Sequence, residues 1–154
     1  MEEIKKRISK QVIVIRKDLR NSKGEKIRTG KIVSQGAHSA LKAILDQFGL
    51  TPNFKYITSK GSDGEVMMSL HIQAGSALND WLFGEMFTKI TVSVNSEAEL
   101  VEVYNKAKEK GLLCSLITDA GLTEFGGIPT LTAVAIGPAW NNDVDSITGH
   151  LSLL

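Results

Sequence analysis

Residues 11–19, QVIVIRKDL, decide the fold of this chain. At their centre stands Val12-Ile13-Val14-Ile15, a run of four β-branched residues with polar or charged residues on both sides. An unbroken apolar run of this length, without the alternation of a half-exposed strand, is typical of a central strand that is buried on both faces. The run therefore predicts a sheet whose middle strand is covered on both sides.

A helix is expected directly after this strand and the polar loop over residues 18–28. Thr29 can cap this helix, and Gly49 suits its end. Apolar residues at helical spacing predict its buried stripe, namely Val33, Ala37, Ala40, Ile44 and Phe48. The other flank of the helix carries Lys31, Gln35, His38 and Lys42.

Further strands and helices alternate along the rest of the chain. Two apolar runs around a Gly-Ser-Asp-Gly turn predict an inserted hairpin at about 53–73, and a short helix follows at 77–83. A buried strand over 89–94 precedes a helix with a capping box of Ser96 and Glu99, and two more strands are expected over 113–118 and 130–136. This alternation predicts a single α/β domain over residues 1–154, with a mixed, mostly parallel sheet and helices on both faces.

Composition excludes several classes of protein. A single cysteine, Cys114, rules out an internal disulfide, and the three histidines have no metal-ligand spacing, so neither a metal nor a cofactor is expected. No apolar stretch reaches the roughly 20 residues of a membrane-spanning helix, and the first residues lack the apolar core of a secretory signal. These features predict a cytoplasmic protein that does not enter a membrane.

Basic residues are concentrated near the N-terminus. Residues 1–31 carry 11 Lys and Arg against four acidic residues, a net charge of +7, whereas the rest of the chain carries −6. Clustered cations release condensed counterions when they bind a phosphate backbone, so this segment is suited to a nucleic acid. A solvated chain end would show the same charge pattern.

Carboxylates follow two of the predicted strands where those strands end, Asp18 after the first and Asp119 after the strand over 113–118. The carboxyl ends of parallel strands meet at the rim where α/β proteins bind ligands, so both are candidates for one site. Ala120-Gly121 would let a substrate approach Asp119 closely. Alternation places Thr130 and Thr132 on the strand face of Val134 and Ile136. A turn aspartate and ordinary strand threonines would look the same.

Five motifs occur in the order QVIVIRKDL, TGKIVSQGAHSA, SLITDAGLTEF, TLTAVAIGP and DSITGHLSLL. Together they resemble the peptidyl-tRNA hydrolase 2 family, over residues 11–48 and 78–154. The resemblance implies hydrolysis of the ester that joins a peptide to the 3′ ribose of tRNA. It also implies peptidyl-tRNA as the partner, and a homodimer is common in such families.

The family's proposed active-site residues correspond here to Lys31, Asp119, Thr123 and Thr132, with Gln35 and His38 in support on the helix. Asp18 is a further supporting candidate because of its place at the rim. The sequence contains no nucleophile elbow, so we expect attack by a water that Asp119 activates or orients. The threonines would hold the water or the carbonyl, and Lys31 would stabilise the oxyanion or pair with Asp119. Candidates for tRNA phosphate contacts are Arg16, Lys17, Arg20 and Lys23.

Departures from the family pattern leave alternatives open. Leu122 stands where the family usually has Arg or Lys, residues 21–26 replace a shorter connection, and residues 49–77 contain the predicted hairpin as an insertion. One alternative is a module that binds tRNA or a protein with little turnover. The other is an ester hydrolase that acts on unblocked aminoacyl-tRNA.

Overall fold

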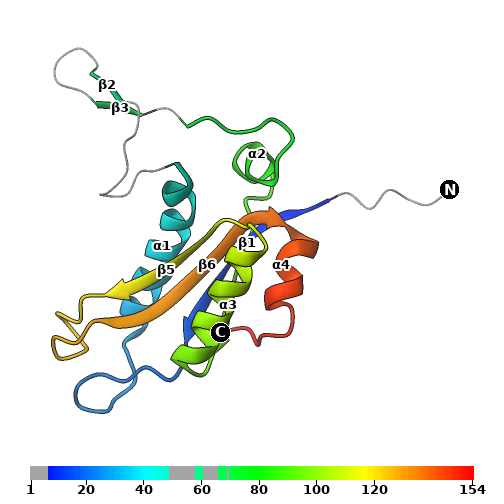
Figure 1. Cartoon of the computed structure of the whole chain (residues 1–154). Helices are drawn as coiled ribbons and strands as arrows, with labels where there is room; N and C mark the ends of the chain where they lie inside the picture. Colours follow the sequence, from blue (N-terminus) through cyan, green and yellow to red (C-terminus); the bar gives the residue numbers. More distant parts are fainter. Residues whose placement is uncertain (1–6, 49–57, 61–65, 69) are drawn as a thin grey trace.

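β1 (Ser9–Arg16) lies inside a four-stranded sheet with the strand order β4-β1-β6-β5. β4 (Lys89–Val94) pairs with β1 in parallel, whereas β6 (Thr130–Trp140) runs antiparallel to both β1 and β5 (Cys114–Asp119). The computed structural model describes residues 7–48, 58–60, 66–68 and 70–154 (Figure 1).

The expectation of a mostly parallel sheet is wrong, because β1 and β4 form its one parallel pair within the described residues. The β5–β6 connection over residues 120–129 contains no helix, and a parallel pairing would need a crossover of about a dozen residues or more, usually helical. β1, β4 and β5 nevertheless point the same way. Their carboxyl ends therefore meet at one edge of the sheet, and the antiparallel β6 begins at that edge.

Helices cover both faces of the sheet, as predicted (Figure 1). Val12 and Val14 of β1 pack with Leu100 of α3 (Glu97–Glu109) and Val144 of α4 (Asn141–Thr148). Ile13 and Ile15 belong to a second cluster on the opposite face, under α1 (Thr29–Leu45). β1 is thus buried on both faces, which explains its unbroken apolar run. The helix α4 is an element that the sequence patterns did not predict.

The buried face of α1 differs from the predicted stripe. Val33 is 64% exposed and Ala37 is also exposed, whereas Gly36 and Ser39 are buried. A Cβ on Gly36 would lie 3.5 Å from Cγ2 of Ile13, so the helix approaches β1 closely through its small residues. The helix is thus oriented by the close packing of its small residues against β1 rather than by burial of its larger apolar side chains. The side chain of Phe48 lies outside the described residues.

The two ends of α1 also differ in detail from the prediction. Arg28 occupies the N-cap position without a capping side-chain hydrogen bond, and Thr29 is the first helical residue. At the other end a 3-10 turn, η1 (Asp46–Phe48), continues the helix. The Ser96 cap of α3 is confirmed, since its Oγ accepts the N–H of Glu99 at 3.1 Å.

The segment between α1 and α2 (Ala77–Phe83) contains two paired strands, β2 (Thr58–Lys60) and β3 (Val66–Met68). They are antiparallel, in agreement with the predicted hairpin. Its turn, and much of the first predicted strand, lie outside the described residues. Among the helices described, none has the length and apolar character that crossing a bilayer would require.

Candidate active site

A cluster of polar side chains occupies the edge where β1 and β5 end and β6 begins. Asp119 is the last residue of β5, Thr132 lies near the start of β6, and Lys31 and Gln35 lie one helical turn apart on α1. In an all-parallel sheet the start of β6 would lie at the opposite edge. The antiparallel insertion of β6 therefore brings Thr132 to the carboxylate.

The strand pairing changes register at Thr132. Thr118 pairs with Leu131 and Ile117 pairs with Ala133, so Thr132 is the extra residue of the irregularity. Such a bulge re-aims a side chain. Thr132 contacts Gln35 on the α1 face, whereas Val134 packs into the cluster on the other face. The alternation that placed Thr132 on the face of Val134 is therefore wrong.

Lys31 and Asp119 form the centre of the cluster. The Nζ of Lys31 donates to Asp119 Oδ1 at 2.7 Å and to Thr123 Oγ1 at 3.1 Å. The backbone N–H of Gly121 donates to Asp119 Oδ2 at 2.9 Å, so both carboxylate oxygens have donors. The Lys31 and Asp119 side chains are only 17% and 13% exposed, which keeps the pair largely shielded from water.

Opposing influences set the pKa of Asp119. Burial raises it, because burial penalises the charged form. Hydrogen bonds from Lys31, Gly121 and Gln35, together with the Lys31 charge, lower it and outweigh burial. The net pKa lies below the ordinary value of an aspartate, so the group is a carboxylate at neutral pH and can accept a proton or a hydrogen bond.

Thr132 reaches Asp119 only through Gln35. Its Oγ1 donates to Gln35 Oε1 at 2.6 Å, and Gln35 Nε2 donates to Asp119 Oδ1 at 3.3 Å. Thr132 is 1% exposed and Gln35 is 5% exposed. The carboxylate accepts from the amide nitrogen and the threonine hydroxyl donates to the amide oxygen, so the two contacts together hold the Gln35 side chain in place.

Two predicted supporting residues lie apart from this hydrogen-bonded group. His38 is exposed on α1 and makes no hydrogen bond or ion pair to the described residues. Asp18 accepts from Arg16 Nε at 3.0 Å and from Arg16 Nη2 at 2.7 Å, and this pairing holds the pKa of Asp18 below its usual value. Asp18 is thus paired with the last residue of β1.

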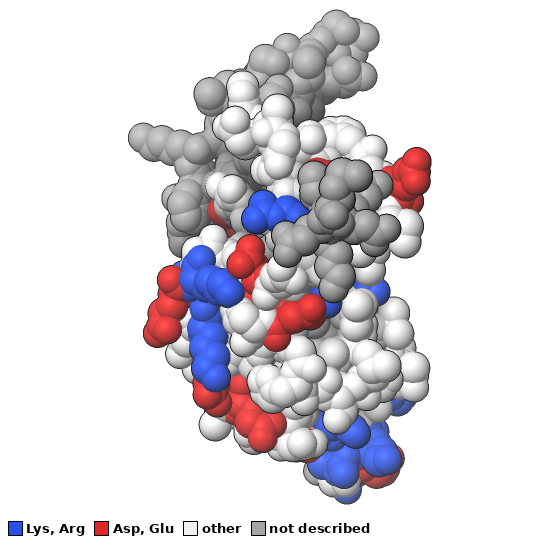
Figure 2. Space-filling view, turned by 90° about the vertical axis from the view of Figure 1, so that its right-hand side faces the viewer, with Lys and Arg blue, Asp and Glu red and all other residues white. Residues whose placement is uncertain are grey.

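The four predicted tRNA contacts differ in exposure. The Arg16 side chain is 11% exposed, and besides Asp18 it donates to the carbonyl oxygen of Leu131 at 2.9 Å. Lys17, Arg20 and Lys23 are exposed. Figure 2 shows basic side chains gathered at the lower end of the molecule, where the loop after β1 lies in Figure 1.

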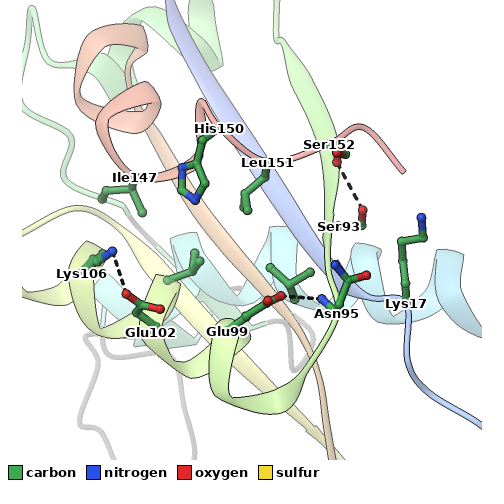
Figure 3. A pocket seen from close by; sticks show the side chains of 12 residues that line it. Lys17, Ser93, Asn95, Glu99, Glu102, Lys106, Ile147, His150, Leu151 and Ser152 are labelled. Carbon is green, nitrogen blue, oxygen red and sulfur yellow. Dashed lines mark hydrogen bonds and ion pairs between the residues drawn. The ribbon is translucent and has the colours of Figure 1, made fainter.

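Lys17 also lines a polar cavity of about 350 Å³ between β4, α3 and the C-terminal segment (Figure 3). Carboxylates and cations are mixed there: Glu102 pairs with Lys106 at 2.9 Å, and Glu99 accepts the N–H of Asn95 at 2.6 Å. This cavity involves none of the residues that surround Asp119.

Glu124 was not among the predicted site residues. It is buried, accepts from Arg28 Nε at 2.7 Å, and its backbone oxygen accepts from the N–H of Ser22 at 3.1 Å. Glu124 thereby fastens the loop that carries Thr123 to the N-terminus of α1, where Lys31 lies. No spacing rule connects residues so distant in the chain, although Glu124 does stand within the SLITDAGLTEF motif.

Comparison with known proteins gives the family to which this chain belongs. The family model described as peptidyl-tRNA hydrolase PTH2 matches residues 9–154. A peptidyl-tRNA hydrolase of Methanocaldococcus jannaschii is 41% identical, covering 94% of this chain and 99% of its own. Peptidyl-tRNA hydrolases of Thermococcus onnurineus (37% identical) and Saccharolobus solfataricus (35% identical) each cover 94% of this chain, and 97% and 98% of their own.

The chain therefore belongs to the PTH2 family of peptidyl-tRNA hydrolases, which are ester hydrolases. This confirms the family predicted from the five motifs. A solved structure of a protein of unknown function from Agrobacterium covers 95% of this chain and 97% of its own, at 14% identity and a TM-score of 0.48, too low to bear on the fold.

Proposed function

We propose that this chain hydrolyses the ester bond between a peptide and the 3′ ribose of tRNA, and that Asp119 orients and deprotonates the attacking water. The observation that supports this most directly is the position of Lys31, whose ammonium donates both to a shielded, ionised Asp119 and to Thr123. Ester hydrolysis by water needs a base, a charge that stabilises the oxyanion and groups that orient the water. The cluster offers each of them.

In the proposed reaction the water oxygen bonds to the carbonyl carbon of the ester, and Asp119 takes the water's proton. The tetrahedral intermediate then collapses, the carbonyl double bond re-forms, the bond to the ribose 3′ oxygen breaks, and that oxygen takes the proton that Asp119 had accepted. Lys31 is assigned to the developing oxyanion. As its ammonium turns from Asp119 toward the oxyanion, the carboxylate loses a hydrogen bond that lowers its pKa, so it becomes a stronger base when the proton is transferred.

The two threonines have different parts in this proposal. Thr123 accepts from Lys31 and is exposed, so its own proton is free to bind the water or the carbonyl oxygen. Thr132 is a positioning residue, because its hydroxyl faces Gln35 rather than the open side of the cluster.

The test replaces Asp119 by asparagine and measures release of tRNA from N-acetylated aminoacyl-tRNA. A positioned base contributes about 10² to 10⁴ in rate, so kcat should fall by at least about tenfold. Asp18→Asn is the matched control, since it changes an aspartate in the loop after β1 that lies outside the cluster. Equal turnover by the wild type and a folded Asp119→Asn variant would remove Asp119 from the chemistry.

For tRNA binding we propose contacts from Lys17, Arg20 and Lys23, which are exposed, and a structural role for Arg16, whose guanidinium is already paired. Removal of one cation that binds a phosphate should reduce the slope of log K against log salt by about 0.7 to 0.9. Replacing all three by glutamine should therefore flatten the slope, whereas Lys108→Gln on α3 should not. Identical slopes for the two variants would contradict the assignment. A cytoplasmic location accords with this substrate, and a homodimer stays a prediction.

A further inference from the structure

Leu122 has an unusual position for an apolar residue. At 87% it has the largest exposed fraction among the large apolar side chains of the described residues. Its two neighbours in sequence both bind the central pair: the N–H of Gly121 donates to Asp119, and Thr123 accepts from Lys31. The leucine is therefore presented to solvent directly beside the groups assigned to the chemistry.

The backbone around Leu122 is held in place. Gly121 has a φ of +80°, and a Cβ there would lie 2.3 Å from the carbonyl oxygen of Ile128. Gly127 donates its N–H to the Gly121 carbonyl at 2.8 Å, which closes the loop. Ile128, which crosses Gly121 so closely, is itself 67% exposed. The loop thus presents apolar side chains outward from a tightly packed backbone.

We propose that Leu122 determines specificity by contacting the side chain of the amino acid that is esterified to tRNA, and that the enzyme favours peptidyl-tRNAs whose C-terminal residue is apolar. This inference rests on the proposed function, because it requires the ester to lie against Asp119. With the ester there, groups on the α-carbon are within one or two bonds of the reacting carbonyl, and so within reach of the residue between Gly121 and Thr123.

The chemistry of leucine favours contact with the amino-acid side chain over contact with the phosphates or bases of the tRNA. A leucine offers neither charge nor hydrogen bonds, so it contributes nothing to holding a phosphate. Nucleic-acid bases are bound by the flat faces of aromatic rings or guanidinium groups, which a branched aliphatic side chain lacks. An apolar amino-acid side chain gains by leaving water against leucine, whereas a polar one does not.

The experiment uses one tRNA body acylated with either N-acetylleucine or N-acetylserine, so that the amino-acid side chain is the only difference. Methylene groups in an enclosed pocket discriminate by roughly 10- to 200-fold, and an open surface by less, so we expect kcat/KM to favour the leucyl ester by about fivefold. Leu122→Ser should remove this preference and Leu122→Met should keep it. Leu41→Ser, which changes an exposed leucine distant on α1, is the control.

A preference that is absent from the wild type, or unchanged in Leu122→Ser, overturns the inference. An equal loss on both esters in Leu122→Ser also overturns it, because it would place the leucine against a part of the tRNA common to both. These outcomes leave hydrolysis itself intact. Failure of the proposed function would appear differently, as hydrolysis of both esters that is indifferent to Asp119→Asn.

Discussion

Replacing Thr132 by valine removes one hydroxyl from the candidate active site and keeps the β-branched shape. In the native protein this hydroxyl donates to Gln35 Oε1 at 2.6 Å, and both residues are at most 5% exposed. The substitution leaves a buried amide oxygen without a donor, which costs about 1–3 kcal/mol in the free energy of unfolding. For a chain of this length each kcal/mol lowers Tm by about 2–4 °C.

The same substitution should affect turnover more than substrate binding. Without the hydroxyl, the Gln35 side chain loses the contact that holds its amide oxygen and can move away from Asp119, which would leave the carboxylate less firmly placed. Small displacements of a reacting group are costly in rate, so kcat should fall by about tenfold with little change in KM. Urea unfolding and release of tRNA from N-acetylated aminoacyl-tRNA measure the two effects.

Thr130→Val is the matched control on the same strand. Its hydroxyl donates to the carbonyl oxygen of Ile128 at 2.9 Å in an exposed setting, so its loss should change stability by less than about 0.5 kcal/mol. If the Thr130 and Thr132 variants unfold at the same urea concentration and turn over alike, then the Thr132–Gln35 contact does not position Asp119.

The ion pairs give two other predictions. Lys31→Met removes the ammonium that lowers the pKa of Asp119 and leaves burial to raise it, so the acid limb of kcat/KM should move to higher pH; an unmoved limb would contradict the pairing. Because the pKa of Asp119 is lower in the folded protein than in the unfolded chain, its ionised carboxylate stabilises the fold above about pH 3.9, the ordinary pKa of an aspartate. This stabilisation is lost as the pH falls through the pKa that Asp119 has in the folded protein. Arg28→Ala should cost about 1–3 kcal/mol, because it leaves the carboxylate of Glu124, only 5% exposed, without its cation. Glu124→Gln should cost less, because it keeps an acceptor and leaves an arginine that is 80% exposed to water; equal costs in urea unfolding would refute this.

Local patterns predicted most of the secondary structure, because each element carries its own signal. The run in β1, the cap of α3 and the apolar alternation of β4 depend on neighbouring residues alone. The direction of β6 depends instead on which strands it joins, and no local pattern encodes that choice. α4 was missed because only Val144 and Ile147 mark its buried face.

The sequence predicted which residues belong to the candidate site, but it did not predict all of the contacts between them. Family motifs named Lys31, Asp119, Thr123 and Gln35, which the structure brings into hydrogen-bond contact. The contact between Thr132 and Gln35 depends on a register shift between β5 and β6, and no periodicity in the sequence reveals that shift. Asp18 stands at the expected rim but satisfies its charge with Arg16 two residues earlier, a local pairing that competes with any distant partner.

The central place of β6 has a consequence for the order in which the enzyme becomes active. β6 is the last of the four sheet strands to leave the ribosome, yet it is the one that joins β1 to β5. Until it inserts, the carboxylate on β5 has no sheet contact with the half of the fold that holds β1 and β4. A nascent chain therefore completes the candidate catalytic cluster only after β6 has been made, so the onset of tRNA release during synthesis would report the closing of the sheet.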